Sequence, residues 1–205
     1  MTTSFDRFLE TVQRLVEHES PTGDVARNRS LANIIAGEME ARGASVERHE
    51  GPGYGDHLVG RFPGFPANNG NAPSPGPLLL LGHMDTVHPV GSLEQMPFGA
   101  QNGKLAGPGV FDMKSGVTLA LVALDEVSRR SEAGEGPGLA GPVTLLVTCD
   151  EEVGSPTSRA LIEEQARSSR ATLVLEPCLP GGVVKTARKG VADYYLTVEL
   201  SLIHI

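Results

Sequence analysis

The run LLLLGHMDTVHP, at residues 78–89, decides how this sequence folds. Its four consecutive leucines are typical of a strand that is covered on both faces, as the strands of parallel sheets are. The apolar run is followed at once by His83 and Asp85, two ionisable residues at close spacing. A buried strand that ends in such residues indicates an α/β sheet with a ligand site at the carboxyl ends of its strands.

Two segments further along the chain have the same form. VTLLVTC at 143–149 is an apolar strand that precedes Glu151 and Glu152, and ATLVLEP at 171–177 begins as a third buried strand and contains Glu176. The carboxyl ends of parallel strands share one edge of a sheet. We therefore expect these side chains, which are far apart in the sequence, to converge at that edge.

A glycine-rich loop supplies one more carboxylate. GPGVFDMKSG at 107–116 places Asp112 directly before a segment with helical spacing. Similar spacing predicts further helices, with Thr3 and Asp6 as a cap pair before the first and Gly43 as the stop of the second. Strands that alternate with helices favour a mostly parallel sheet between helix layers. The predicted helices cover 5–16, 24–42, 114–130 and 157–168, and two further strands cover 45–49 and 57–62.

Length, charge and cysteine content exclude several classes of protein. The 205 residues carry a net charge of −8 without a basic cluster, which argues against a nucleic-acid partner. No apolar run approaches the roughly 20 residues that cross a bilayer, so we expect no membrane partner. Two cysteines cannot form a disulfide framework, and a reducing cytoplasm is the expected location. The turn-rich stretch at 63–77 is predicted to be a hairpin tip without function.

Converging carboxylates repel one another unless a cation or a proton compensates. Imidazole and carboxylate together are a normal ligand set for Zn²⁺ and similar ions, and a carboxylate that bridges two ions allows a two-metal site. Such a site lowers the pKa of a bound water and polarises a carbonyl. Of the neighbours Glu151 and Glu152, one could ligate while the other stays free as a general base.

Simpler explanations exist for each residue taken alone. Asp112 could cap a helix, Glu151 and Glu152 could form a solvated acidic face before one, and Glu176 could lie in a plain turn. The combination of the clusters makes these weaker than the metal hypothesis. Lys114 and the glycine at 109 partly match the phosphate-binding loop motif, but the second glycine of that motif is missing. The histidines that have no partner at ligand spacing are expected to have surface or cap roles: His18, His49, His57 and His88.

Four motifs together resemble a known family. HMDTVHP, GPGVFDMKSG, DEEVGS and LEP, in this order and at these separations, resemble the di-zinc metallopeptidase family of carboxypeptidase G, aminoacylase-1, acetylornithine deacetylase and succinyl-diaminopimelate desuccinylase. The likeness is greatest to the glutamate carboxypeptidase branch and extends to about Glu199. It implies an α/β fold: a three-layer zinc-exopeptidase-like domain with a mostly parallel central sheet. It also implies two Zn²⁺ ions, for which Co²⁺ or Mn²⁺ could substitute.

The resemblance implies a set of metal ligands. His83 and Glu176 would ligate one zinc ion, and Glu152 would ligate the second. Asp112 would bridge the two ions, and a cis peptide is expected between Asp112 and Met113.

The resemblance also assigns two catalytic residues. Glu151 would be the general base that takes a proton from a metal-bridging water. Asp85 would hydrogen-bond the imidazole of His83 and fix its tautomer.

Relatives in this family are considerably longer than this chain. The resemblance divides the chain into a catalytic domain at 1–187 and the start of an α+β lid domain at 188–205, of which only the first strand is expected. A late histidine that completes the second zinc shell in relatives has no counterpart here, and His204 is not assigned that role. The last six residues, LSLIHI, match what a sequencing adapter would encode, so we expect a truncated reading frame.

The implied activity is hydrolysis of an amide bond. The expected substrates are small peptides, as for a glutamate carboxypeptidase, or alternatively N-acyl amino acids, as for a deacylase of the same family. A hypothesis of another class is a non-catalytic metal-binding module. The 205-residue chain itself is expected to be inactive, and the full-length protein is expected to form a homodimer through the lid.

Overall fold

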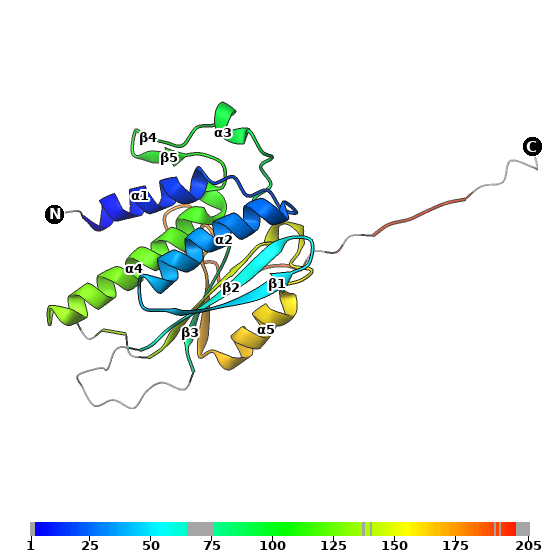
Figure 1. The fold of residues 1–205 in the computed structure, drawn as a ribbon. Helices are drawn as coiled ribbons and strands as arrows, with labels where there is room; N and C mark the ends of the chain where they lie inside the picture. Colours follow the sequence, from blue (N-terminus) through cyan, green and yellow to red (C-terminus); the bar gives the residue numbers. More distant parts are fainter. Residues whose placement is uncertain are drawn as a thin grey trace, which may run out of the picture.

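Five strands form a central sheet in the order β1-β2-β6-β3-β7 in the computed structural model (Figure 1). The structure describes residues 3–64, 76–136, 138–139, 141–190, 192 and 194–199. Part of the predicted hairpin tip, at 65–75, and the last six residues lie outside the described residues. The strands are β1 (Ser45–Gly51), β2 (Gly55–Phe62), β3 (Leu78–His83), β6 (Val143–Thr148) and β7 (Ala171–Val174).

Four of these strands run in one direction. β3 pairs in parallel with both β6 and β7, whereas β2 pairs antiparallel with both β6 and β1. The predicted mostly parallel sheet is thus confirmed, with β2 as the one opposed strand of the sheet. The parallel part, β6-β3-β7, contains the three apolar strands that the sequence indicated.

Helices cover both faces of the sheet. α1 (Ser4–Val16), α2 (Val25–Glu40) and α4 (Ser115–Glu132) lie on one face, and α5 (Arg159–Ser168) lies on the other (Figure 1). Strand β6 is buried along its whole length, and its side chains alternate between the two sides. Leu145 and Val147 join the core under α1, α2 and α4, whereas Leu146 packs with Leu161 and Ile162 of α5. The three-layer architecture is therefore confirmed.

The predicted helix ends are present. Thr3 and Asp6 form a reciprocal capping box, in which each side chain accepts a hydrogen bond from the other residue's backbone N–H. Gly43 follows α2 with a φ of 81°, a left-handed conformation that glycine adopts without strain.

The stretch between β3 and α4 contains elements that the sequence analysis did not predict. It contains a short helix, α3 (Ser92–Gln95), and a hairpin of β4 (Gly99–Gln101) and β5 (Lys104–Ala106). Asn102 and Gly103 connect the hairpin, both with positive φ, as a two-residue turn of this type requires. The dipeptide Asn-Gly was the local signal for this hairpin, and elements this short leave little periodicity to detect.

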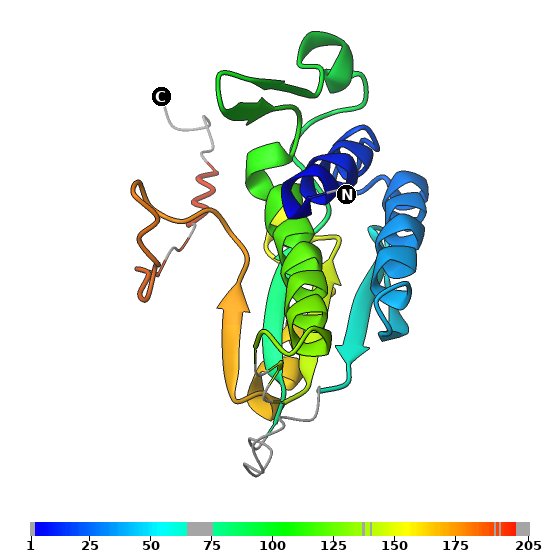
Figure 2. The ribbon, with the colours of Figure 1, turned by 90° about the vertical axis from the view of Figure 1, so that its left-hand side faces the viewer.

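Strand β7 differs from the buried strand expected at this position. All four of its residues are exposed, and Leu173 and Val174 are exposed by 51% and 57%. Its position explains this: β7 is the edge strand beside β3, and the described residues place no element on its free edge (Figure 2).

The described residues after β7 contain no helix and no strand beyond an isolated bridge between Leu179 and Val183. The strand predicted within 188–205 is therefore not formed in the part that the structure describes, where Tyr194 and Tyr195 are more than 90% exposed. A strand is held by hydrogen bonds to a neighbour, and among the described residues no strand pairs with this segment. The predicted boundary at residue 187 stays a prediction. Within the described ranges, no helix has the length and apolar character needed to span a membrane.

Candidate active site

Three adjacent strands carry the predicted site residues to one edge of the sheet. His83 is the last residue of β3. Glu151 and Glu152 begin a short 3₁₀ turn, Glu151–Val153, just beyond β6, and Glu176 lies two residues beyond β7. Because β3 pairs in parallel with both neighbours, these ends lie side by side, as the sequence predicted.

Asp112 reaches the same edge from the loop before α4. It lies in a turn, Val110–Lys114, that departs from helical geometry at Asp112 and Met113, and a cis peptide bond joins these two residues, as expected. Its backbone is not helical, and α4 begins without a side-chain cap, so the alternative role of Asp112 as a helix cap is wrong.

Gly116 lets the start of α4 lie against the end of β7. A Cβ atom at position 116 would come within 2.1 Å of the carbonyl oxygen of Leu175. The two segments therefore meet backbone to backbone. This contact places the Asp112 loop beside the turn that holds Glu176.

The imidazole of His83 is the centre of the cluster. Its Nε2 lies 3.0 Å from Oδ1 of Asp112, 3.3 Å from Oε1 of Glu176 and 3.8 Å from Oε2 of Glu151. Its Nδ1 lies 3.0 Å from the backbone oxygen of Asp85 and 3.4 Å from Oδ1 of the same residue. With Nδ1–H donating to Asp85, Nε2 is the ring atom that faces the carboxylates: it donates to them when protonated and is free to ligate a cation when deprotonated.

Asp85 contacts more of the site than the imidazole alone. Its side chain is fully buried. The backbone N–H of Glu151 donates to Oδ1 at 3.3 Å, and that of Glu152 donates to Oδ2 at 3.3 Å. The hydroxyl of Thr22 donates to Oδ2 at 2.8 Å. One buried carboxylate therefore connects the β3 loop, the β6 turn and the segment between α1 and α2.

The six predicted site residues thus converge, and the donor atoms of five of them, all except Asp85, fall into two overlapping groups. His83, Asp112 and Glu152 offer atoms that all lie within 4.8 Å of one another, and so do His83, Glu151 and Glu176. The resemblance instead places Glu176 on the same ion as His83, with Asp112 bridging to the second ion, and it leaves Glu151 free as the general base. Both groups share His83, which carries positive charge when protonated and attracts every nearby carboxylate. These groups do not separate two ion positions, so the division of ligands between two ions stays a prediction.

The pKa values of the cluster show its mutual coupling. Burial lowers the pKa of His83, but hydrogen bonds to Asp85 and Glu176 and the nearby negative charges outweigh it and raise the pKa to about 11. Burial, together with neighbouring carboxylates, raises the pKa of both Glu151 and Glu152. The hydrogen bond with His83 lowers the pKa of Glu176.

The donor set fits a divalent cation. One imidazole and several carboxylates within ligand distance of one another combine nitrogen and oxygen donors that Zn²⁺ accepts. Burial, and after it the charge of neighbouring carboxylates, raises the pKa of Glu151 and Glu152, as expected of groups that a cation would stabilise in their ionised form. Oxygen and nitrogen donors do not by themselves select zinc over manganese or cobalt.

Sequence reasoning missed a buried group that supports the Glu151 turn. His57 is 1% exposed, so its expected surface or cap role is wrong. Its Nδ1 accepts from the backbone N–H of Cys149 at 3.3 Å, and its Nε2 therefore donates to Oγ1 of Thr157 at 2.9 Å. The Thr157 hydroxyl donates to Oδ2 of Asp150 at 2.7 Å.

Asp150 is itself buried and accepts hydrogen bonds from four groups. Thr157 supplies its backbone N–H and its hydroxyl, both at 2.7 Å, and Ser158 supplies its backbone N–H at 3.1 Å and its hydroxyl at 2.6 Å. Asp150 directly precedes Glu151, so this arrangement anchors the turn from the side of α5. Its partners lie seven and eight residues away, and no local motif in the sequence indicated them.

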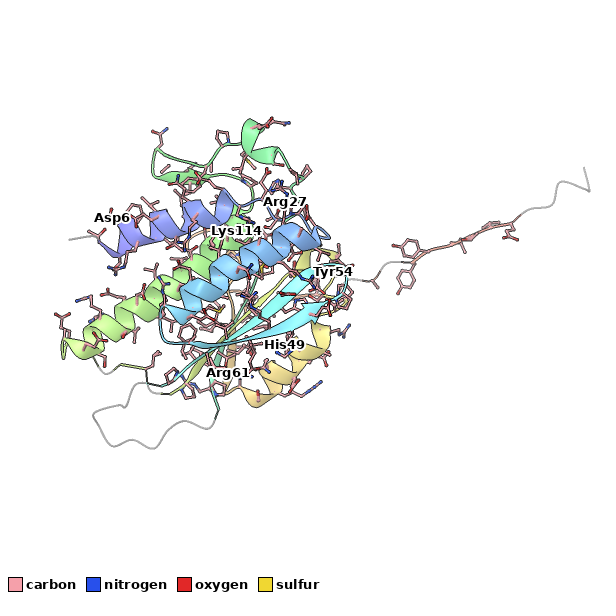
Figure 3. All side chains as sticks on the ribbon, viewed as in Figure 1. Asp6, Arg27, His49, Tyr54, Arg61 and Lys114 are labelled. Atoms are coloured by element: carbon pink, nitrogen blue, oxygen red, sulfur yellow. The ribbon has the colours of Figure 1, made fainter. Side chains whose placement is uncertain are left out.

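Lys114 does not face the site. It is 2% exposed and its Nζ donates to the backbone oxygen of His18 at 2.9 Å, beneath α1 (Figure 3). Burial lowers its pKa to about 7. This position agrees with the rejection of a phosphate-binding loop at Gly109, because the ammonium group points into the protein.

Comparisons with known proteins place the chain among metallopeptidases. The model of peptidase family M20/M25/M40 matches residues 79–201. Carboxypeptidase G2 of Pseudomonas sp. (strain RS-16) is 34% identical over 175 residues, which cover 84% of this chain and 39% of that protein. Succinyl-diaminopimelate desuccinylase of Methylobacterium sp. (strain 4-46) is 34% identical over 181 residues, covering 80% of this chain and 42% of that protein.

Solved structures show the same fold. The aminopeptidase PepT from Bacillus cereus ATCC 10987 superposes with a TM-score of 0.67 at 19% identity, over 84% of this chain and 43% of that chain. The M20 family metallo-carboxypeptidase Sso-CP2 from Sulfolobus solfataricus superposes with a TM-score of 0.65 at 20% identity, over 85% of this chain and 38% of that chain. The chain thus spans about two fifths of the length of these relatives, and it belongs to peptidase family M20/M25/M40.

Proposed function

We propose that the complete protein is a zinc-dependent metallo-exopeptidase that hydrolyses amide bonds in the manner of a glutamate carboxypeptidase. One observation carries this proposal: His83 and four carboxylates from three strand ends and one loop meet at one edge of the sheet. The family match and the likeness to carboxypeptidase G2 support it.

His83, Asp112, Glu152 and Glu176 would hold the metal. Two zinc ions, when bound, supply polarisation of the substrate carbonyl and a lowered pKa of the attacking water. Asp85 holds the imidazole through Nδ1, so that Nε2 stays available as a ligand atom.

Glu151 acts as general acid and base. Its side chain is 46% exposed, and burial and neighbouring carboxylates raise its pKa, which makes it a stronger base than an ordinary glutamate. It accepts a proton from the attacking water and passes it to the amine that leaves. Its backbone N–H is fixed by Asp85, so the side chain is positioned by its turn.

The substrate proposal is a small peptide with a C-terminal acidic residue. A second candidate is deacylation of N-acyl amino acids, favoured by the likeness to succinyl-diaminopimelate desuccinylase. Both reactions break an amide next to a free carboxylate. We also propose that the complete protein dimerises through a segment outside this chain, and that the 205-residue chain alone does not turn over substrate.

The test compares wild type, Glu151→Gln and the matched control Glu164→Gln, an exposed residue of α5, in the complete gene product. Turnover of peptides ending in glutamate and of N-acyl amino acids is measured with and without a chelator, beside zinc content. We expect turnover to fall by about 10²–10⁴-fold in Glu151→Gln, with zinc retained, and to be unchanged in the control. Full turnover in Glu151→Gln would reject its role.

The same assay distinguishes an enzyme from the alternative, a non-catalytic metal-binding module. A wild-type protein that binds zinc yet hydrolyses none of these substrates would support a metal-binding module. Chelator-sensitive hydrolysis by the purified 205-residue chain would contradict the expectation that it is inactive.

A further inference from the structure

We propose that Thr22 is a positioning residue for this site, acting through Asp85 on both the imidazole of His83 and the turn that carries Glu151 and Glu152. This inference rests on the proposed function for its consequence in catalysis, but the contact itself does not depend on it. Thr22 lies in the segment between α1 and α2, 63 residues before its partner, and no motif in the sequence indicated it.

The hydroxyl of Thr22 has a preferred acceptor. It lies 2.8 Å from Oδ2 of Asp85 and 3.4 Å from the backbone oxygen of Thr86. A hydroxyl has one proton to donate, and a short bond to a charged acceptor is the stronger of the two. The proton therefore goes to Asp85.

The backbone around Thr22 is held without this hydroxyl. The backbone N–H of Thr22 donates to the oxygen of Thr86 at 3.1 Å, and that of Thr86 donates to the oxygen of Ser20 at 2.9 Å. The hydroxyl of Ser20 donates to the oxygen of Met84 at 2.7 Å, and Pro21 forms a parallel bridge with Thr86. Removing the Thr22 hydroxyl thus deletes one contact and leaves the segment in place.

Asp85 has no solvent to replace a lost donor. Its side chain is 0% exposed, and its oxygens are divided between different tasks. Oδ1 faces Nδ1 of His83 and the N–H of Glu151, whereas Oδ2 takes the N–H of Glu152 and the Thr22 hydroxyl. The Thr22 bond is the shortest of these, so it is the contact that fixes the rotation of the carboxylate about its Cβ–Cγ bond. Without this bond the carboxylate can rotate. It then no longer holds His83 and the β6 turn in fixed positions relative to each other.

The test uses Thr22→Val, which keeps the shape and removes the hydroxyl, and Thr22→Ser, which keeps the hydroxyl. Thr144→Val, at a buried threonine of β6, is the matched control for the loss of a buried hydroxyl. Zinc affinity of the 205-residue chain is measured by competition with a chromophoric chelator. We expect Thr22→Val to weaken zinc binding by about tenfold, as loss of a partner that orients a ligand does elsewhere. Thr22→Ser and Thr144→Val should stay within about twofold of wild type.

A second measurement needs neither zinc nor activity. In chelator-treated protein, the Nδ1–H proton of His83 is followed by NMR at constant pH, with His83→Ala for its assignment. We expect slow exchange with water in wild type and Thr22→Ser, and faster exchange in Thr22→Val. In the complete gene product, Thr22→Val should lower kcat more than it changes KM.

The outcomes distinguish this inference from the proposed function. Wild-type zinc affinity and slow exchange in Thr22→Val would overturn the positioning role, as would equal losses in Thr22→Ser. If wild type hydrolyses no substrate but the exchange difference is present, the proposed function fails while the role of Thr22 in holding Asp85 stands.

Discussion

The site has two halves that differ in how the protein holds them. His83 and Asp85 form the buried half, with side chains 1% and 0% exposed, and the Nδ1 side of the ring and both oxygens of Asp85 are engaged by groups of the protein. The exposed half consists of Asp112, Glu151, Glu152 and Glu176, which come from three other segments. Side-chain exposures are 53% for Asp112, 46% for Glu151 and 30% for Glu176. The fold therefore holds His83 and Asp85 in fixed positions and leaves the other charged groups facing solvent. Substitutions in the buried half should therefore cost much more stability than substitutions in the exposed half.

The largest effect is expected for Asp85→Ala in chelator-treated protein. This change removes the buried carboxylate that faces Nδ1 of His83 and that accepts from the Thr22 hydroxyl and from the backbone N–H groups of the β6 turn, and it should lower the free energy of unfolding by about 3–5 kcal/mol. Urea denaturation measures it. Asp112→Ala, in the exposed half, is the comparison and should cost less than about 1 kcal/mol. Equal losses in the two variants would break the division into halves.

A smaller loss is expected for Thr157→Val. The hydroxyl of Thr157 lies between Nε2 of His57 and Oδ2 of Asp150, and both partners are buried. Its removal should cost about 1–3 kcal/mol, because the buried Nε2–H of His57 loses its acceptor and Asp150 loses one of its four donors. Thr157→Ser should recover most of this in the same denaturation experiment. A valine variant as stable as wild type would show that the buried His57 group does not support the β6 turn.

Glu152→Gln should change stability in the opposite direction. Burial and the charge of Asp112 raise the pKa of Glu152, so the folded protein disfavours its ionised form. Neutral glutamine removes that cost, and the thermal midpoint of chelator-treated protein should rise by about 2 °C. Zinc should reverse the order if Glu152 is a ligand, as we propose, because the variant then loses it. A lower midpoint without zinc would contradict the repulsion inferred for the exposed half.

The smallest effect concerns pH and His57. Burial lowers its pKa against the opposing charges of Asp150, Asp85 and Asp56, and His49 lowers it further. The unfolded chain binds a proton at this residue as pH falls below about 6.5, whereas the folded protein does not, so stability is lost in that range. Between pH 6.5 and 5.5 the loss should be at most about 1 kcal/mol, and His57→Gln should lack it. An unchanged pH slope in the variant would assign the loss to other groups.

The sequence predicted the residues of both halves, but it did not predict the contacts that Thr22 and His57 make beneath them. His83, Asp112, Glu151 and Glu176 lie next to apolar strands or in a glycine-rich loop, and parallel topology then brings them together. These are local patterns combined with one general rule of sheet structure.

The supporting residues carry no such local signal. Thr22 meets Asp85 across 63 positions, and His57 meets Thr157 across 100. A single polar residue in a strand looks the same in sequence whether its side chain faces solvent or a buried partner. The exposure of β7 was missed for a related reason: the apolar stretch ATLV predicts a strand but not that the strand lies at the edge of the sheet.

The close approach at Gly116 has a consequence for how this site tolerates change. Leu175 is joined directly to Glu176, and Asp112 lies four residues before Gly116. The separation between these two carboxylates is therefore limited by main chain resting on main chain, with room for a hydrogen atom and nothing larger. Repacking of neighbouring side chains cannot relieve a contact between two main-chain segments. Even a single methyl group at position 116 would therefore push Asp112 and Glu176 further apart.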